Sequence, residues 1–127
     1  MFHYTVETSK GLQEAAESLE ASLKEEQFGV LWNFDIKDKL NEKGLAFEKG
    51  FKVLEVCNPK EAQRILNENM MAGYFLPCKM VIYEDEGKTK IGMPKPTALT
   101  QMVEDDNIQA MASDIESRLI HCIDQSV

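Results

Sequence analysis

Apolar and polar residues alternate over residues 2–7 and again over residues 28–36, which is the period of a half-buried strand. In the second stretch one predicted face holds five apolar side chains, namely Phe28, Val30, Trp32, Phe34 and Ile36. An aromatic face of this kind needs cover, so we expect it to lie against a layer of helices. Further strands are expected over residues 51–57, 78–84 and 89–93, and the last two are joined by a turn that contains Gly87.

The longer segments between these strands have the period of a helix. Over residues 9–27 the apolar positions form one helical stripe, which consists of Leu12, Ala15, Ala16, Leu19 and Leu23. A last helix, from about residue 106, has a stripe that consists of Ile108, Met111, Ala112, Ile115, Leu119 and Ile123. Both helices are therefore expected to bury one face, and a short helix over residues 97–103 is expected just before the second of them.

Several local signals agree on the start of another helix at Asn58. Asn58 is a preferred N-cap residue, Pro59 suits the first helical position, and Glu61 is placed to complete a capping box. A short helical turn is also expected to begin at Asp38 and to end at Gly44.

These elements predict an α+β fold with the order β-α-β-β-α-β-β-α. Short connections between neighbouring strands favour an antiparallel sheet of about five strands, with two or three main helices packed on one face. The other face of the sheet is then expected to be solvated, to form a pocket or to pair with a second subunit. At 127 residues, the chain is expected to form a single globular domain over residues 1–127.

Composition excludes several kinds of partner. The formal net charge of −8 opposes binding to nucleic acid or to an anionic membrane, because both need clustered basic residues. No segment has the length and apolar content of a membrane span, and residues 1–10 do not have the pattern of a signal peptide.

Three cysteines without close pairing indicate free thiols and a reducing cytoplasm. Glycine-rich phosphate loops are missing from the sequence, and we expect no cofactor.

The motifs "VLEVCNPKEAQRIL" and "LPCKMVIYE", followed by the amphipathic last helix, resemble the family called domain of unknown function 302. The resemblance extends from about Thr5 to Ile123. It implies a compact α+β domain that forms homodimers, and it implies no particular activity or catalytic residue.

Cys57 and Cys78 are the candidates for thiol chemistry. Cys57 immediately precedes the helix that begins at Asn58, where the helix dipole could lower the pKa of the thiol. If the two strands are neighbours, Cys57 and Cys78 could form a redox pair or a soft-metal site. The alternative is that both pack as small apolar side chains, which is the usual role of free cysteine. Metal-binding spacings such as CxxC are absent, and we expect no metal.

The segment "MMAGYFLPC", residues 70–78, is the candidate surface for a ligand or partner. It holds two adjacent methionines and two aromatic residues in a predicted loop, and the residues that we select are Met70, Met71, Tyr74, Phe75 and Cys78. The sequence thus predicts a homodimeric binding module for a small apolar ligand or a partner protein rather than an enzyme. The alternative is a thiol-dependent enzyme, redox sensor or soft-metal protein that uses Cys57 and Cys78.

Overall fold

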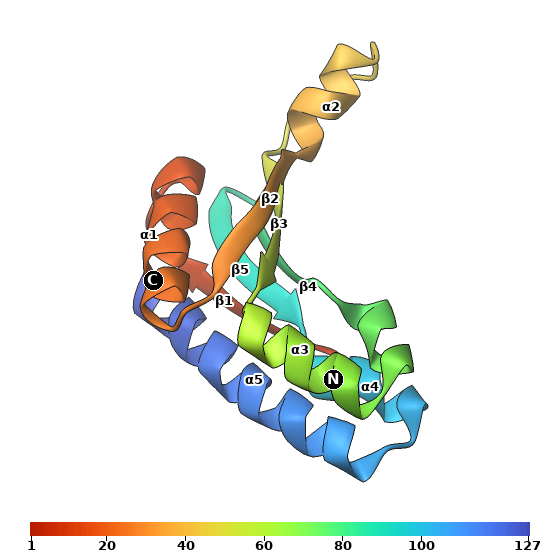
Figure 1. Cartoon of the computed structure of the whole chain (residues 1–127). Helices are drawn as coiled ribbons and strands as arrows, with labels where there is room; N and C mark the ends of the chain where they lie inside the picture. The colour runs from red at the N-terminus through yellow and green to blue at the C-terminus, as the bar shows by residue number, and fades with distance from the viewer.

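The computed structural model describes all of residues 1–127 and contains five strands, five α-helices and two 3-10 helices (Figure 1). The strands are β1 (His3–Thr8), β2 (Gly29–Asp35), β3 (Phe51–Cys57), β4 (Cys78–Asp85) and β5 (Lys88–Pro94). The helices are α1 (Leu12–Glu25), α2 (Ile36–Glu42), α3 (Pro59–Glu68), η1 (Met70–Phe75), α4 (Pro96–Thr100), η2 (Gln101–Val103) and α5 (Asp106–Ser126).

The five strands form one sheet in the order β1-β5-β4-β3-β2, and every neighbouring pair is antiparallel. The first strand therefore lies at one edge beside the last, and β4 lies at the centre. β4 and β5 are joined by a tight turn in which Glu86 and Gly87 both have positive φ angles. The predicted α+β class and antiparallel sheet are confirmed.

The two long helices, α1 and α5, pack on each other and on one face of the sheet, with α3 beside α5 (Figure 1). Alternate strand residues point into this layer and are buried; they include Leu54, Val56, Met80, Ile82 and Ile91. The predicted helical stripes supply the other half of the core. Ala15, Ala16, Leu19 and Leu23 of α1 are buried, as are Ile108, Ala112, Ile115, Leu119 and Ile123 of α5.

The predicted placement of the β2 aromatic face is wrong. The register of β2 against β3 shifts between Val30 and Trp32, so Leu31 forms a bulge. Val30 lies opposite buried Val56, but Trp32 lies opposite Glu55 and points to the other side of the sheet. Leu31 and Trp32 are consequently 61% and 60% exposed. A bulge adds one residue to one strand, and it therefore reverses the side on which all later residues lie.

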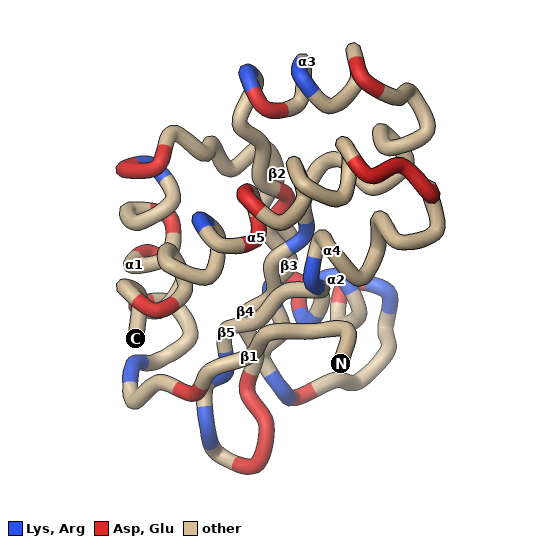
Figure 2. The backbone as a smooth tube through the Cα atoms, turned by 90° about the horizontal axis from the view of Figure 1, so that it is seen from below, with Lys and Arg blue, Asp and Glu red and all other residues tan.

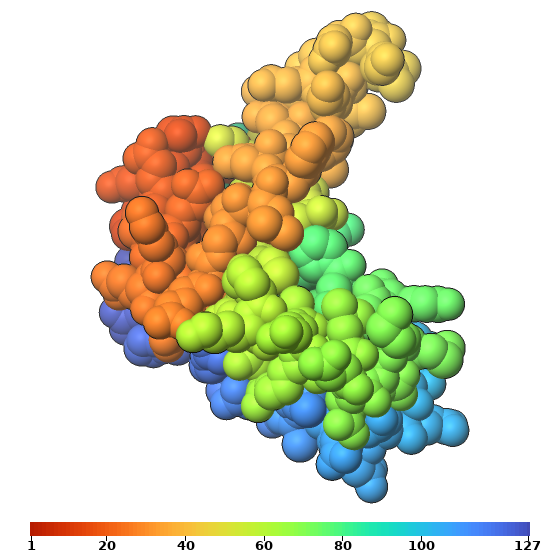
Figure 3. All heavy atoms as spheres, viewed as in Figure 1, coloured from red at the N-terminus to blue at the C-terminus, as the bar shows by residue number.

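After β2 the chain leaves the body of the molecule, and residues 36–49 form what we call the arm (Figures 1 and 3). The arm contains α2, which has no buried residue. α2 begins earlier than predicted, because the Asp35 side chain accepts a hydrogen bond from the Asp38 N–H at 3.0 Å and so caps the helix. Gly44, with a φ of 79°, follows the helix as predicted.

Asn58 caps α3 as predicted, since its side-chain oxygen accepts hydrogen bonds from the N–H groups of Lys60 and Glu61. The predicted capping box is not formed. The Glu61 carboxylate instead pairs with Arg64 at 2.7 Å and with Arg118 of α5 at 3.4 Å, which ties α3 to α5. The segment that follows, predicted as a loop, is the 3-10 helix η1.

Candidate functional site

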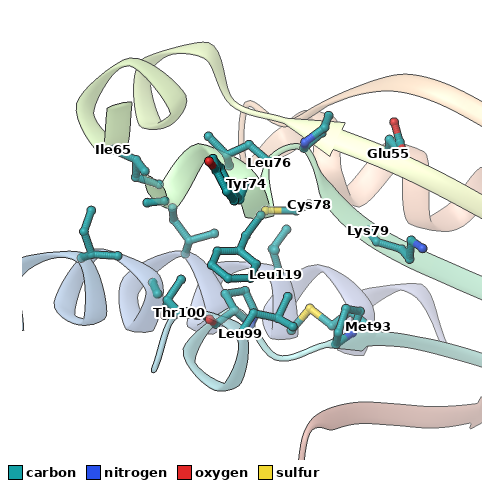
Figure 4. Close-up of a pocket in the computed structure, with 18 residues that line it drawn as sticks. Glu55, Ile65, Tyr74, Leu76, Cys78, Lys79, Met93, Leu99, Thr100 and Leu119 are labelled. Carbon is teal, nitrogen blue, oxygen red and sulfur yellow. Dashed lines mark hydrogen bonds between the residues drawn. The ribbon is translucent and has the colours of Figure 1, made fainter. Parts of the chain in front are cut away.

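A cavity of about 400 Å³ lies between η1, α4, α5 and the adjoining ends of β4 and β5 (Figure 4). Tyr74 and Cys78 contribute to its upper wall in Figure 4, and Leu99 and Leu119 lie across from them. Of the 18 residues that line it, 12 are hydrophobic. This volume falls within the range of small-molecule pockets, which are concave and mostly apolar.

The α5 stripe forms one wall of the cavity. Ile108, Ala112, Ile115 and Leu119 follow one another at helical spacing along this wall. Ala112 lies between bulkier neighbours, and its single methyl group leaves room that a larger side chain would fill.

Hydrogen bonds fix α4 and η1 over this wall. The Thr97 N–H and hydroxyl donate to Glu116 Oε1 of α5 at 3.0 and 2.7 Å, and the Gln109 side-chain amide donates to the Thr97 carbonyl at 2.9 Å. On the η1 side, Asn69 caps the helix by accepting from the Met71 N–H at 2.9 Å, and its amide donates to Asp105 at 3.3 Å. The cavity is thus bounded by elements that are tied to α5 at two separate places.

Few polar groups reach the cavity, and the Thr100 hydroxyl among them is already hydrogen-bonded. The Thr100 hydroxyl lies 2.9 Å from the Pro96 carbonyl oxygen and 2.9 Å from Gln109 Oε1. Its proton is therefore donated to one of these two acceptors and is not available to a ligand. Glu55 and Lys79 are the charged residues of the lining, and they lie opposite each other in the β3–β4 register at the end of the sheet. The arrangement can hold an apolar molecule with a charged pair at the rim.

The predicted segment, residues 70–78, is divided between two surfaces. Tyr74, Phe75 and Cys78 line the cavity. Met70 and Met71 face solvent on the outside of η1 and are 74% and 58% exposed, and Tyr74 is 81% exposed although part of it contributes to the wall. The wall residues from α4 and α5 were not predicted as site residues, because in the sequence they are indistinguishable from ordinary core positions.

The family model described as Domain of unknown function DUF302 matches residues 4–126. The chain belongs to this family. A crystal structure of an uncharacterised conserved DUF302 protein from Bacillus stearothermophilus is 57% identical in sequence and has a TM-score of 0.98, and the match covers 100% of this chain and 99% of that one. No curated protein matches the chain. The predicted resemblance is confirmed, and since the family description names no activity, function has to be argued from the site.

The thiols of this DUF302 chain lie on opposite sides of the sheet. Cys78 pairs with Val56 in the register and shares the helix-covered face with it, whereas Cys57 is the next residue after Val56 and so points the other way. All three cysteines are free. No group of three or more His, Cys, Asp or Glu side chains is placed to hold a metal ion.

Burial raises the pKa of each thiol, which is the opposite of what thiolate chemistry needs. Desolvation, with a smaller contribution from Cys57, raises the pKa of Cys78 to about 11. The pKa of Cys57 is also raised by desolvation, although the residue precedes α3. The helix N–H groups of Lys60 and Glu61 are already bound to the Asn58 side chain, so they are not available to a Cys57 thiolate.

Proposed function

We propose that this chain is a binding module for a small apolar ligand, held in the cavity under η1. The observation that carries the proposal is an apolar space of about 400 Å³ whose walls come from separate elements of the chain. Apolar surface of this kind gains free energy when a ligand replaces water on it. The proposal assigns Tyr74, Phe75 and Cys78 to the wall, and Met70 and Met71 to the outer surface of η1.

Binding is favoured over catalysis by the character of the lining. General acid–base or nucleophilic catalysis needs a titratable group with a pKa near neutrality beside the reacting atoms. Cys78 is the thiol of the lining, and a pKa of about 11 keeps it protonated at neutral pH. For the same reason the thiol-dependent alternative has less support than the binding function.

The proposed setting is a reducing cytoplasm, supported by three free thiols and an acidic surface. None of the helices combines the length and the apolar character that crossing a bilayer requires. The net charge of −8 supports an apolar or protein partner over nucleic acid.

The test is a titration with N-phenyl-1-naphthylamine, a neutral fluorophore that brightens in apolar surroundings. We expect saturable binding with one probe per chain, accompanied by methyl NMR shifts at Leu99, Ile115 and Leu119. The variant Ala112→Leu fills the cavity and is expected to weaken probe binding at least 10-fold.

Ala110→Leu is the matched control, since Ala110 lies two residues away on the exposed side of the same helix. It should bind the probe as the unmodified chain does. Equal binding by both variants, or NMR shifts confined to Met70, Met71 and other surface methyl groups, would contradict a ligand site inside the cavity.

A further inference from the structure

The rim of the cavity holds two opposite charges that have no ion-pair partner. Glu55 of β3 lies opposite Lys79 of β4 in the register, and both residues line the cavity beside its apolar wall. The seven ion pairs of the chain, with nitrogen and oxygen up to 4.0 Å apart, include neither of them. A ligand that binds to Glu55 and Lys79 therefore does not have to break an existing ion pair.

The residues around this pair leave both charges accessible. Glu55 is half-buried and Lys79 is exposed, and the β2 residue opposite Glu55 is Trp32, which carries no charge. On its other side Lys79 borders a hollow of about 420 Å³ that His3 also lines and that has no acidic residue in its lining. Figure 4 shows Glu55 and Lys79 at the same end of the cavity, on neighbouring strands. The rim thus presents one anion and one cation side by side.

A pair of opposite charges selects a ligand that carries both charges itself. A molecule with only a carboxylate is attracted by Lys79 and repelled by Glu55, and a simple amine meets the reverse. Acidic residues are frequent elsewhere, on α1 and just before α5, as the red segments of Figure 2 show. The net charge of −8 repels a free anion further. An amine gains from the net charge but still meets Lys79 at the rim, whereas a zwitterion pairs with both residues.

The distance between the two charged residues favours an α-amino acid. Residues that lie opposite each other on antiparallel strands have Cβ atoms about 4.5–5.5 Å apart. An α-amino acid carries its ammonium and carboxylate groups on one carbon atom, so Glu55 and Lys79 can bind them at the same time. A peptide is less suited, because each further residue separates its terminal charges by about 3.8 Å.

The cavity provides space for the side chain of that amino acid. A volume of about 400 Å³ has room for roughly a dozen water-sized groups, which is more than the side chain of leucine, methionine or phenylalanine fills. The wall that includes Ile115 and Leu119 is apolar and gains free energy when such a side chain replaces water. A polar side chain would find few partners there, since the Thr100 hydroxyl is already hydrogen-bonded.

We propose that the ligand is a free α-amino acid with an apolar side chain. Glu55 binds its ammonium group, Lys79 binds its carboxylate, and the cavity holds its side chain. This inference rests on the proposed function, because it names the class of ligand for the same cavity. Three separate contacts fix the groups around the α-carbon, so the site distinguishes L- from D-amino acids. One enantiomer is expected to bind roughly 10-fold more tightly than the other, which must give up one charged contact.

Titration of the full chain with L-leucine, L-methionine and L-phenylalanine, followed by methyl NMR, tests the proposal. We expect saturable shifts at Leu99, Ile115 and Leu119, and a different affinity for D-phenylalanine. Two analogues each lack one charge of phenylalanine: 3-phenylpropanoate has no ammonium group, and 2-phenylethylamine has no carboxylate. Each should bind roughly 10-fold more weakly or worse, because a contact with a charged group is lost.

Glu55→Gln and Lys79→Gln each remove one charge from the rim and are expected to weaken phenylalanine binding roughly 10-fold or more. Glu55→Gln should not weaken the binding of 3-phenylpropanoate, and Lys79→Gln should not weaken that of 2-phenylethylamine, because the contact in question is already missing. Glu7→Gln and Lys88→Gln are the matched controls. Glu7 and Lys88 also form a pair of opposite charges, 3.6 Å apart, but at the other end of β5 from the cavity. Both controls should bind phenylalanine as the unmodified chain does.

The outcomes separate this inference from the proposed function. If N-phenyl-1-naphthylamine binds in the cavity but none of the three amino acids does, the inference is overturned and the proposed function stands. The same holds if 3-phenylpropanoate or 2-phenylethylamine binds as tightly as phenylalanine, or if the two enantiomers bind equally. Control variants that lose as much affinity as Glu55→Gln would also overturn it. If neither the fluorophore nor the amino acids bind, both proposals fail.

Discussion

The helix-covered face of the sheet and its open face, the side turned away from α1 and α5, are built from alternate residues of the same five strands. In β3, Leu54 and Val56 are fully buried under the helices, whereas Phe51 and Val53 on the other side are only partly buried within the chain. The two sets are equally apolar, so hydrophobicity alone does not determine which of them the chain covers. When a strand has apolar residues on both sides and the chain covers only one of them, the other side is available for contact with another molecule.

The sharpest test of this comparison uses two neighbouring residues of β3. Leu54→Ala is expected to lower the free energy of unfolding by about 2–5 kcal/mol, because it leaves a cavity in the core. Val53→Ala, on the open face, should cost about 1 kcal/mol or less, because its side chain is only partly buried. Urea denaturation at low protein concentration measures both, and equal losses would contradict the assignment of the two faces.

The rates at which the thiols are alkylated should differ between the two faces of the sheet. At pH 8 a thiol with a pKa of about 11 has roughly 100-fold less thiolate than one at the ordinary value of 9.0, so Cys78 and Cys122 should react slowly with iodoacetamide. Cys57 is expected to react at least 10-fold faster than either. Mass spectrometry of the alkylated peptides measures the order, and in denaturant the three rates should become similar. If Cys78 reacted first in the folded chain, the result would support a thiol-dependent activity of Cys57 and Cys78 instead.

A smaller effect is expected where the helix-covered layer begins, at the N-cap of α3. Asn58→Ala removes the acceptor for two helix N–H groups and should cost about 1 kcal/mol of unfolding free energy. Asn33→Ala, at an exposed position in β2, serves as the control. It should change the free energy of unfolding by only a few tenths of a kcal/mol. Thermal or urea unfolding compares the two, and an Asn58→Ala chain as stable as the control would exclude the capping role.

The last expected effect is on stability at alkaline pH. Because the folded-state pKa of Cys78 is about 11, the unfolded chain loses this thiol proton first as the pH rises. The contribution of the protonated Cys78 thiol to folding stability is complete below the pKa of the thiol in the unfolded chain, near 9. It is lost as the pH rises toward 11. Cys78→Ala should therefore flatten the decrease of the urea midpoint between pH 8 and pH 11. Identical slopes for the two chains would show that Cys78 is not buried as described.

Most of the fold could be predicted because its signals are local. The N-cap at Asn58, the turn at Gly87 and the stripe from Ile108 to Ile123 depend on residues that are near one another in sequence. The error at Trp32 has a different origin. Every second residue from Phe28 to Ile36 is apolar, and the bulge at Leu31 exists only in the pairing with β3, which no local pattern records.

The candidate site could be predicted only in part, for a similar reason. Two adjacent methionines followed by aromatic residues indicated an exposed apolar segment, and Met70, Met71 and Tyr74 are indeed exposed. The cavity itself depends on how α4 and η1 are held over α5 by Thr97 and Asn69. Its volume is a property of packing between distant segments, and Leu99 or Ala112 therefore carries no recognisable signal in the sequence.

The pairing of β1 with β5 has a consequence for how the molecule is made. On the ribosome β1 and α1 emerge before their partners, because the strand that receives β1 ends at Pro94 and the helix that packs on α1 ends at Ser126. The apolar stripe of α1 thus lacks the helix that packs on it until α5 has been synthesised. A nascent chain that stalls before α5 is therefore a substrate for chaperones and proteases rather than a smaller folded unit.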